Sequence, residues 1–338
     1  MRPFAYTRAP NRATALREAA SAAGPPHVEA PVQYLAGGTT LVDLMKLDVM
    51  RPGRLVDING LAREHGQISS GPDGLRLGAL VHMNEAAEHP AVRRDYPVIA
   101  ESLWLAASPQ IRNMASLGGN VLQRTRCPYF RDVSWEACNK RRPGSGCGAI
   151  EGVNRRLAVL GGSDHCIANY PGDFAVALAA LGATVDVEGP RGARVIALED
   201  LHRLPDDTPH IETTLAPGEL ITGFVVPAGP WARRSLFLKI RDRESYEFAL
   251  ASAAVALDLD GGTVREARIG LGGLAAKPWR AHEAEVVLRG KPLDERQAQA
   301  AAEAAFATAR PPKGAAFKVE LGKRTLVRAL LQAKAMEV

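Results

Sequence analysis

The sequence lacks the features of several specialised classes of protein. Aromatic residues make up only 5% of its 338 residues, and no apolar run approaches the roughly 20 residues that a membrane-spanning helix requires. The amino terminus has no apolar core followed by a small-residue cleavage site, so we expect no secretory signal on this chain. The net charge of +5, from 42 Lys and Arg against 37 Asp and Glu, is too small to require an acidic partner.

Cysteine is also scarce, and its distribution is uneven. Four cysteines are too few for a secreted protein built on disulfides, yet all four lie between Cys127 and Cys166. The rest of the composition, with 46% hydrophobic and 23% charged residues, is that of an ordinary globular protein. At this length we expect two or three domains, because a single core rarely grows beyond about 250–300 residues.

Hydrophobic periodicity divides the chain into regular parts and an irregular middle. The pattern predicts helices at Asn11–Ala23, Thr39–Leu47, Pro97–Ala107, Pro171–Gly182, Asp294–Ala307 and Lys318–Ala335. It predicts strands at Val32–Gly37, Arg54–Ile58, Leu75–Leu80, Ala183–Gly189, Glu219–Val226, Ser235–Arg241, Ala249–Leu257 and Val264–Leu271. Between Ser108 and Tyr170 the periodicity lapses, and so long an irregular stretch is uncommon unless a cofactor or function organises it. Strands followed by helices beyond about residue 230 indicate a separate α+β domain.

A glycine pair lies between a predicted strand and a predicted helix. The segment is LAGGTTL, from Leu35 to Leu41. Glycines let a ligand approach the backbone, and the start of a helix favours negative charge, so the segment suits a phosphate group. A tight turn with a threonine cap explains the same residues equally well.

A second segment, SPQIRNMASLGGN from Ser108 to Asn120, repeats this chemistry. Two such segments can hold two parts of one long ligand, and a dinucleotide fits because its diphosphate needs several backbone donors and little bulk. Arg112 is a further candidate donor, although a solvent-facing arginine is the commoner case. A third segment, GLGGLA at Gly270–Ala275, formally matches a dinucleotide fingerprint. We reject it because Lys277 and Pro278 follow where the helix should begin.

The four cysteines are separated by 10, 8 and 18 residues. Four thiolates bind either zinc or an iron–sulfur cluster. Structural zinc sites use cysteine pairs about two to four residues apart, and the sequence has no such pair, so the spacing favours a cluster. Six cations and two acids between Arg124 and Cys147 give a local charge of +4, which suits an anionic cluster. Free thiols or disulfides are the alternative, because buried free cysteine is common.

Two charged positions outside these segments have two interpretations each. Asp173, at the start of a predicted helix, is either a cofactor ligand or an acid favoured at a helix amino terminus. Lys239 lies in a run of charged residues that is either a cofactor contact or the polar face of a strand. Residue type and spacing do not separate these interpretations.

Taken together, these segments resemble a known family. LAGGTTL, IRNMASLGGNVLQRTRCPYFRD, CNKRRPGSGC and HCIANYPGD are similar to the FAD-binding (medium) subunits of molybdenum hydroxylases, the xanthine dehydrogenase family. Within it, the strongest resemblance is to the FAD and iron–sulfur subunits of bacterial periplasmic aldehyde oxidoreductases. The likeness spans nearly the whole chain, including LGGLAAKPWRA and the terminal KRTL segment. The four-cysteine insertion is its most specific part, because most members of the family lack it.

The resemblance implies a set of binding residues. FAD contacts in the first segment fall on Gln33, Tyr34, Leu35, Ala36, Gly37, Gly38, Thr39, Thr40 and Leu41. Further contacts fall on Ser108, Ile111, Ser116, Gly118, Gly119, Asn120 and Asp173, with a flavin-contacting lysine at Lys239. The ligands of an additional 4Fe-4S cluster fall on Cys127, Cys138, Cys147 and Cys166.

The resemblance also implies a fold. It is an α+β fold with a FAD-binding domain of the vanillyl-alcohol-oxidase or PCMH type, made of two subdomains. We expect that domain at residues 1–226, with subdomains at about 1–53 and 54–226 and the cysteine-rich loop at about 124–170. A domain like the carboxy-terminal domain of CO dehydrogenase flavoprotein follows at 230–338.

The implied function is electron transfer in a heterotrimeric, molybdenum-dependent aldehyde oxidoreductase. A large partner subunit holds the molybdenum cofactor, a small one holds 2Fe-2S centres, and this chain passes electrons to an external acceptor. We expect no catalytic residue, nucleic acid or membrane insertion, and a location either in the periplasm by co-export with a partner or in the cytoplasm. The equivalent subunit of a xanthine dehydrogenase or hydroxybenzoyl-CoA reductase complex is the first alternative. A zinc-bearing nucleic-acid-binding protein is the remote one.

Overall fold

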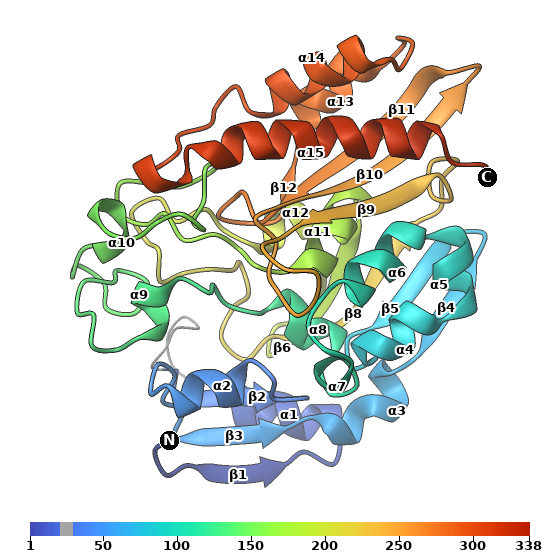
Figure 1. The fold of residues 1–338 in the computed structure, drawn as a ribbon. Coiled ribbons are helices and arrows are strands. Elements are labelled where there is room, and N and C mark those ends of the chain that lie inside the picture. The colour runs from blue at the N-terminus through green and yellow to red at the C-terminus, as the bar shows by residue number, and fades with distance from the viewer. Residues whose placement is uncertain (21–29) are drawn as a thin grey trace.

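The computed structural model describes residues 1–20 and 30–338, in which three sheets organise the chain (Figure 1). The first is a parallel sheet with the strand order β1-β3-β2. Its elements are β1 (Ala5–Arg8), α1 (Arg12–Ala20), β2 (Val32–Leu35), α2 (Leu41–Lys46) and β3 (Arg54–Asp57). Residues 21–23 of the first predicted helix lie outside the described residues. Because β3 pairs with both neighbours, the first unit extends to Asp57, beyond the predicted boundary at residue 53.

The central unit is an antiparallel sheet with the order β4-β5-β8-β6-β7. Its strands are β4 (Ile68–Gly71), β5 (Gly74–Gly78), β6 (Thr184–Gly189), β7 (Gly192–Ala197) and β8 (Leu220–Pro227). Half-buried and buried residues alternate along β6, as expected for a strand with one face on a core. The accompanying helices are η1 (Asn59–Leu61), α3 (Ala62–His65), α4 (Met83–Glu88), α5 (Pro90–Asp95), α6 (Pro97–Trp104), α11 (Asp173–Ala180) and α12 (Leu198–Leu201). Every residue of α11 is buried, which makes this helix the centre of the molecule.

The carboxy-terminal unit is a second antiparallel sheet, with the order β12-β11-β10-β9. Its strands are β9 (Ser235–Ile240), β10 (Ala251–Asp260), β11 (Thr263–Gly272) and β12 (Trp279–Arg280). Its helices are α13 (His282–Leu288), α14 (Glu295–Ala305), η2 (Lys313–Ala315) and α15 (Phe317–Lys334), which lie together along the sheet (Figure 1). Residues 251–257 of β10 are all buried, because the strand contacts α15 as well as α6 and α11.

The irregular middle of the chain contains only short helices. They are α7 (Pro109–Arg112), α8 (Leu117–Val121), α9 (Pro128–Arg131) and α10 (Gly148–Glu151). We call residues 124–170 the cysteine loop; in Figure 1 its helices α9 and α10 lie on the flank between the first and last units. Cys127, Cys138 and Cys166 share a small core with Leu44 and Met45 of α2. The loop therefore shares a small core with α2, while its Val159 and Leu160 pack in the core of the carboxy-terminal unit.

Every predicted helix and strand has a counterpart in the structure, with ends that differ by a few residues. The periodicity missed short elements such as β1, β4, α5 and α13, which are too brief to establish a repeat. The rejected segment at Gly270–Ala275 begins inside β11, where a Cβ on Gly270 would lie 2.5 Å from the Val176 carbonyl oxygen. Its glycine thus allows α11 to pack on the strand. No helix within the described ranges is long and apolar enough to cross a membrane.

Candidate functional site

The two glycine segments lie directly against each other. A Cβ on Gly37 would stand 1.8 Å from the Met114 carbonyl oxygen, so only glycine fits at this position. Gly38 has a φ of +72°, which glycine adopts without strain, and α2 begins at Leu41. The chain therefore leaves β2 through a turn in which Gly37 packs against the Met114 carbonyl and Gly38 lies beside the side chains of Leu35 and Val42.

Serine side chains organise the second segment. Ser108 Oγ accepts a hydrogen bond from the Ile111 amide at 3.4 Å, and Ser116 Oγ accepts one from the Gly119 amide at 3.2 Å. A Cβ on Gly118 would lie 3.1 Å from the Cβ of Ala79, so this glycine pair is also closely packed. The two serines fix these turns, and the Gly118 and Asn120 amides donate to the Ala79 and Ser116 carbonyls, each at 2.8 Å.

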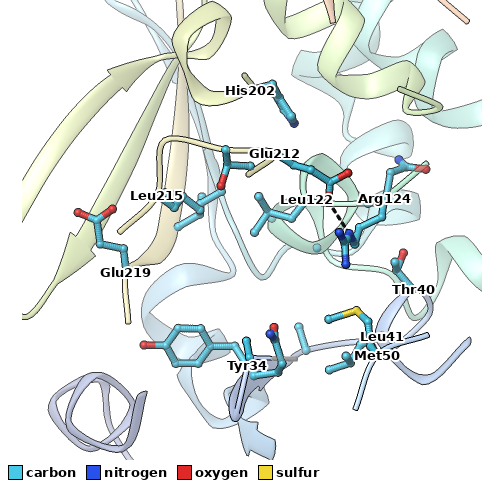
Figure 2. A pocket seen from close by; sticks show the side chains of 18 of the residues that line it. Tyr34, Thr40, Leu41, Met50, Leu122, Arg124, His202, Glu212, Leu215 and Glu219 are labelled. Atoms are coloured by element: carbon cyan, nitrogen blue, oxygen red, sulfur yellow. Dashed lines mark hydrogen bonds and ion pairs between the residues drawn. The ribbon is translucent and has the colours of Figure 1, made fainter. Parts of the chain in front are cut away.

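A cavity of about 310 Å³ lies between the two segments. Figure 2 shows Tyr34, Leu41 and Met50 on one side of it and Leu122, Arg124 and Glu212 on the other. The predicted FAD residues that line it are Gln33, Tyr34, Ala36, Gly37, Gly38, Thr39, Thr40, Leu41, Ser116, Gly118 and Gly119. Leu35, Ser108, Ile111, Asn120, Asp173 and Lys239 are predicted contacts that do not line it. The fold thus brings most of both segments to one cavity.

Asp173 and Lys239 form a buried ion pair with each other. Lys239 Nζ lies 2.6 Å from Asp173 Oδ2 and donates a second hydrogen bond to the Leu105 carbonyl at 2.9 Å. Their side chains are 4% and 1% exposed, respectively. Burial raises the pKa of Asp173, and the Lys239 ammonium opposes that effect. The pair connects α11 to β9 beside the chain that leads into Ser108.

Three charged side chains form one wall of the cavity. Arg124 Nε donates to Glu212 Oε2, and Lys140 Nζ lies 2.9 Å from Glu212 Oε1. The side chains of Arg124 and Lys140 are only 10% and 11% exposed. Burial alone would raise the pKa of Glu212, but the two cations outweigh it and lower that pKa to about 2. Glu212 is therefore ionised at physiological pH.

A neutral histidine lies next to this wall. His202 Nε2 donates to the Val121 carbonyl at 3.0 Å, and burial lowers the pKa of His202 to about 4. Tyr170 Oη donates to the same carbonyl at 2.8 Å, and its ring meets that of His202 edge-on. Both residues line the cavity, so this part of its surface carries no charge near neutral pH.

The four cysteines are free of disulfides and gather in one core. Cys127, Cys138 and Cys166 are buried, Cys147 is half-buried, and Cys138 pairs with Cys147 in an isolated antiparallel bridge. Burial raises the pKa of Cys127 to about 12 and also raises those of Cys138 and Cys166. Burial therefore favours the protonated thiols of Cys127, Cys138 and Cys166, and a metal that binds them must displace these protons.

No group of three or more His, Cys, Asp or Glu side chains in residues 1–20 and 30–338 is arranged to hold a single metal ion. Such an arrangement for zinc requires four ligand atoms around one ion, with zinc–sulfur distances near 2.3 Å. Cys166 is the one of the four cysteines that also lines the cavity. The cysteine core and the cavity therefore share a boundary.

Comparison with known proteins assigns the family. Residues 2–229 match the FAD binding domain in molybdopterin dehydrogenase, and residues 237–333 match the CO dehydrogenase flavoprotein C-terminal domain. The chain belongs to the molybdopterin dehydrogenase FAD-binding family. This membership confirms the predicted family, the α+β fold and FAD as a cofactor.

Individual relatives in this family cover the whole length. The chain is 44% identical to the aldehyde oxidoreductase FAD-binding subunit PaoB of Escherichia coli (strain K12), over 99% of both chains. It is 29% identical to the carbon monoxide dehydrogenase medium chain of Afipia carboxidovorans, over 89% of this chain and 88% of that one. Among solved structures, reconstituted CO dehydrogenase from Oligotropha carboxidovorans has a TM-score of 0.76 at 26% identity and covers 100% of both chains.

Sequence reasoning missed the charged wall. Arg124 and Lys140 contribute to the positive charge of the cysteine loop, but nothing in their spacing points to the cavity. Glu212 lies in a connector without periodicity, 88 residues from Arg124. Only a search for an acidic residue that could pair with the positive charges of the cysteine loop would have selected Glu212.

Proposed function

We propose that this chain is the FAD-binding electron-transfer subunit of a molybdenum-dependent aldehyde oxidoreductase and that it also carries a 4Fe-4S cluster. The main supporting observation is the glycine cradle, by which we mean Gly37, Gly38, Gly118 and Gly119 at the cavity. Within it, Gly37 admits no side chain beside the Met114 carbonyl. It is supported by the 44% identity, over nearly the full length, to a subunit named for aldehyde oxidoreductase and FAD. The cradle explains how the chain binds the cofactor, and the relative supports the substrate class.

We assign the diphosphate of FAD to the two glycine pairs. Gly37 and Gly38 on one side and Gly118 and Gly119 on the other offer backbone with little bulk, which a diphosphate requires. Asp173 and Lys239 lie beyond the cavity lining, and we assign them to the flavin ring on the family resemblance. When bound, FAD supplies the redox chemistry, and the protein supplies orientation and charge.

We assign the cluster to Cys127, Cys138, Cys147 and Cys166. Four free cysteines in one core form the donor set that a 4Fe-4S cluster uses. Each thiolate of such a cluster binds a different iron, so the sulfurs need not surround a single point as they do for zinc. Lys140 lowers the pKa of Cys166 against the effect of burial, and Arg141 does the same for Cys138. These cations favour the thiolates that iron binds.

The proposed domain division and partners follow the same reasoning. The FAD-binding domain spans residues 1–226, with its first subdomain ending after β3, and the carboxy-terminal domain spans 230–338. A large subunit with the molybdenum cofactor and a small one with 2Fe-2S centres deliver electrons to this chain. The external acceptor then receives them.

Cofactor analysis of the chain, purified without oxygen, tests the proposal. We expect one FAD and about four iron and four labile sulfide per chain, the content of one cubane cluster. A colourless, iron-free protein would contradict both assignments. One zinc per chain together with salt-sensitive binding of nucleic acid would instead support the remote alternative.

Substrate assays on the assembled complex test the reaction. We expect turnover of aromatic aldehydes and little turnover of purines or acyl-CoA thioesters. Rejection of every aldehyde would overturn the substrate class and favour a xanthine dehydrogenase or hydroxybenzoyl-CoA reductase type of complex, while leaving the cofactor assignments intact.

A further inference from the structure

Arg124 and Lys140 of the charged wall also belong to the cysteine loop. Arg124 lies three residues before Cys127, and its guanidinium stacks 4.6 Å over Phe130, which packs in the cysteine core. Lys140 lies two residues after Cys138 and donates to the Pro209 carbonyl at 3.0 Å. Both cations thus reach from the proposed cluster site to the proposed FAD cavity, which all three charged side chains line.

Glu212 holds these two cations from the opposite side. Its two carboxylate oxygens are divided between them, one to Arg124 and one to Lys140. The segment that carries Glu212 is fixed in turn, because the Arg203 amide donates to the Glu212 carbonyl at 2.9 Å and His202 pairs with Thr213. The carboxylate is therefore placed by backbone contacts and can orient both cations.

One donor of this network has no acceptor. Arg124 Nη2 is buried and makes no hydrogen bond within the described residues. A buried donor without a partner is costly, so such an atom at a cavity wall indicates a missing acceptor. Figure 2 shows Arg124 between Glu212 and Thr40, at the end of the cavity where α2 begins. An anionic oxygen of FAD is the acceptor that the proposed function supplies.

We propose that Glu212 is a positioning residue that holds Arg124 and Lys140 between the two cofactors, so that Arg124 binds FAD and both cations raise the reduction potential of the cluster. This inference rests on the proposed function. A 4Fe-4S cluster gains negative charge on reduction, so a fixed cation nearby favours its reduced form. Because the wall is largely shielded from water, these charges act more strongly than exposed ones.

Redox titration of the cluster, followed by electron paramagnetic resonance, tests the effect on potential. Lys140→Gln removes a cation, so we expect a lower potential than in the wild type. Glu212→Gln removes a negative charge but also releases both cations, and these two changes act on the potential in opposite directions, so this variant serves as the background for the double variant. Arg142→Gln is the matched control: it removes a cation from an exposed position in the same loop, where solvent screens it, and we expect little shift.

The double variant separates positioning from a simple sum of charges. Without Glu212, Lys140 loses a carboxylate partner and its fixed place. We therefore expect Lys140→Gln to shift the potential less in the Glu212→Gln background than in the wild type. Equal shifts in both backgrounds would contradict a positioning role for Glu212.

FAD affinity tests Arg124 separately. After removal and titration of FAD, Arg124→Gln should bind it roughly ten- to hundredfold more weakly, as expected for a lost hydrogen bond to a charged group. Arg124→Lys keeps the charge but not the forked donors, so we expect it to retain the cluster potential and still lose FAD affinity. If Arg124 had only a structural role, Arg124→Lys would change both the cluster potential and the FAD affinity, or neither.

The outcomes distinguish this inference from the proposed function. A wild-type chain without FAD or iron would defeat the proposed function itself. A wild-type chain that holds both cofactors, with an unchanged potential in Lys140→Gln and unchanged FAD affinity in Arg124→Gln, would overturn the inference alone. If Glu212→Gln fails to assemble the cluster, the cluster potentials of Lys140→Gln and Lys140→Arg are compared instead. Only Lys140→Gln changes the charge, so only it should lower the potential.

Discussion

The carboxy-terminal unit and the cysteine loop become ordered by different means. In the carboxy-terminal unit, long strands and helices bury a continuous apolar core that includes Leu257, Ile269 and Leu271. The cysteine loop has only short helices, and three of its four cysteines take the place of aliphatic side chains in its core. One region is ordered by buried hydrocarbon, whereas the other depends on polar contacts and, in our proposal, on a bound cluster.

In the cysteine loop, side chains make many of the hydrogen bonds that the backbone makes to itself in strands and helices. Arg141 Nη1 donates to the carbonyls of Tyr129 and Phe130 at 2.6 and 2.9 Å. Asn139 Oδ1 accepts from the Gly146 amide at 2.8 Å. Irregular backbone must find hydrogen-bond partners outside a ladder, and side chains supply them here. The loop therefore depends on these polar contacts as well as on its small apolar core.

The largest expected effect is therefore the loss of the cluster. We expect Cys147→Ser to lose the cluster iron and to make residues 124–170 sensitive to protease, while FAD at saturating concentration remains bound, because the glycine cradle lies outside the loop. Metal analysis, flavin absorbance and limited proteolysis measure the three properties. Simultaneous loss of all flavin would show instead that the cavity and the loop fold as one unit.

A core substitution in the other region should have the converse effect. Leu271 is fully buried in β11, and Leu271→Ala should lower the free energy of unfolding by about 2–5 kcal/mol. Val286→Ala is the control in the same unit: Val286 is 68% exposed, so we expect a change within about 0.5 kcal/mol. Urea titration measures both. A loss of cluster iron in folded Leu271→Ala would show that Val159 and Leu160, which share this core, carry the effect into the cysteine loop.

Lys318 joins the two regions, and its contribution to stability depends on pH. Its Nζ donates to the carbonyls of Leu157 and Gly273 at 2.8 and 2.6 Å and thus connects α15 to the cysteine loop. Burial lowers the pKa of Lys318 to about 7, with a further contribution from Arg155 and Arg156. In the unfolded chain, the pKa of a lysine is about 10.4.

The sign of the pH dependence follows from proton binding. Between pH about 7 and about 10.4, the unfolded chain binds the proton that folded Lys318 has released, so the free energy of unfolding rises with pH. The slope contributed by one group is at most about 1.4 kcal/mol per pH unit. Lys318→Met should remove this contribution in denaturation measured across the range. If the free energy of unfolding of Lys318→Met kept the same slope with pH, another group would be the cause of the pH dependence.

Sequence reasoning succeeded where a signal is local. The periodicity of Lys318–Ala335 and of Val264–Leu271 predicted a helix and a strand, because each repeat records which face the element buries. The structure has them at Phe317–Lys334 and Thr263–Gly272. The glycine pairs predicted close approach of a phosphate to the backbone, which stays a prediction, and the structure shows that Gly37 also lets the two segments pack against each other. Asp173 and Lys239 remain predicted flavin contacts, since the ion pair between them leaves both interpretations of each residue open.

By itself, the sequence determined the family, the order of helices and strands, and the two segments suited to a diphosphate. Those features depend on spacing along the chain, which folding does not change. Only the tertiary structure brought Glu212 to Arg124 and Lys140, and Cys166 to the cavity wall. The physical reason is that an ion pair forms only within a few ångströms, whereas these partners are far apart along an irregular chain whose path no periodic pattern records.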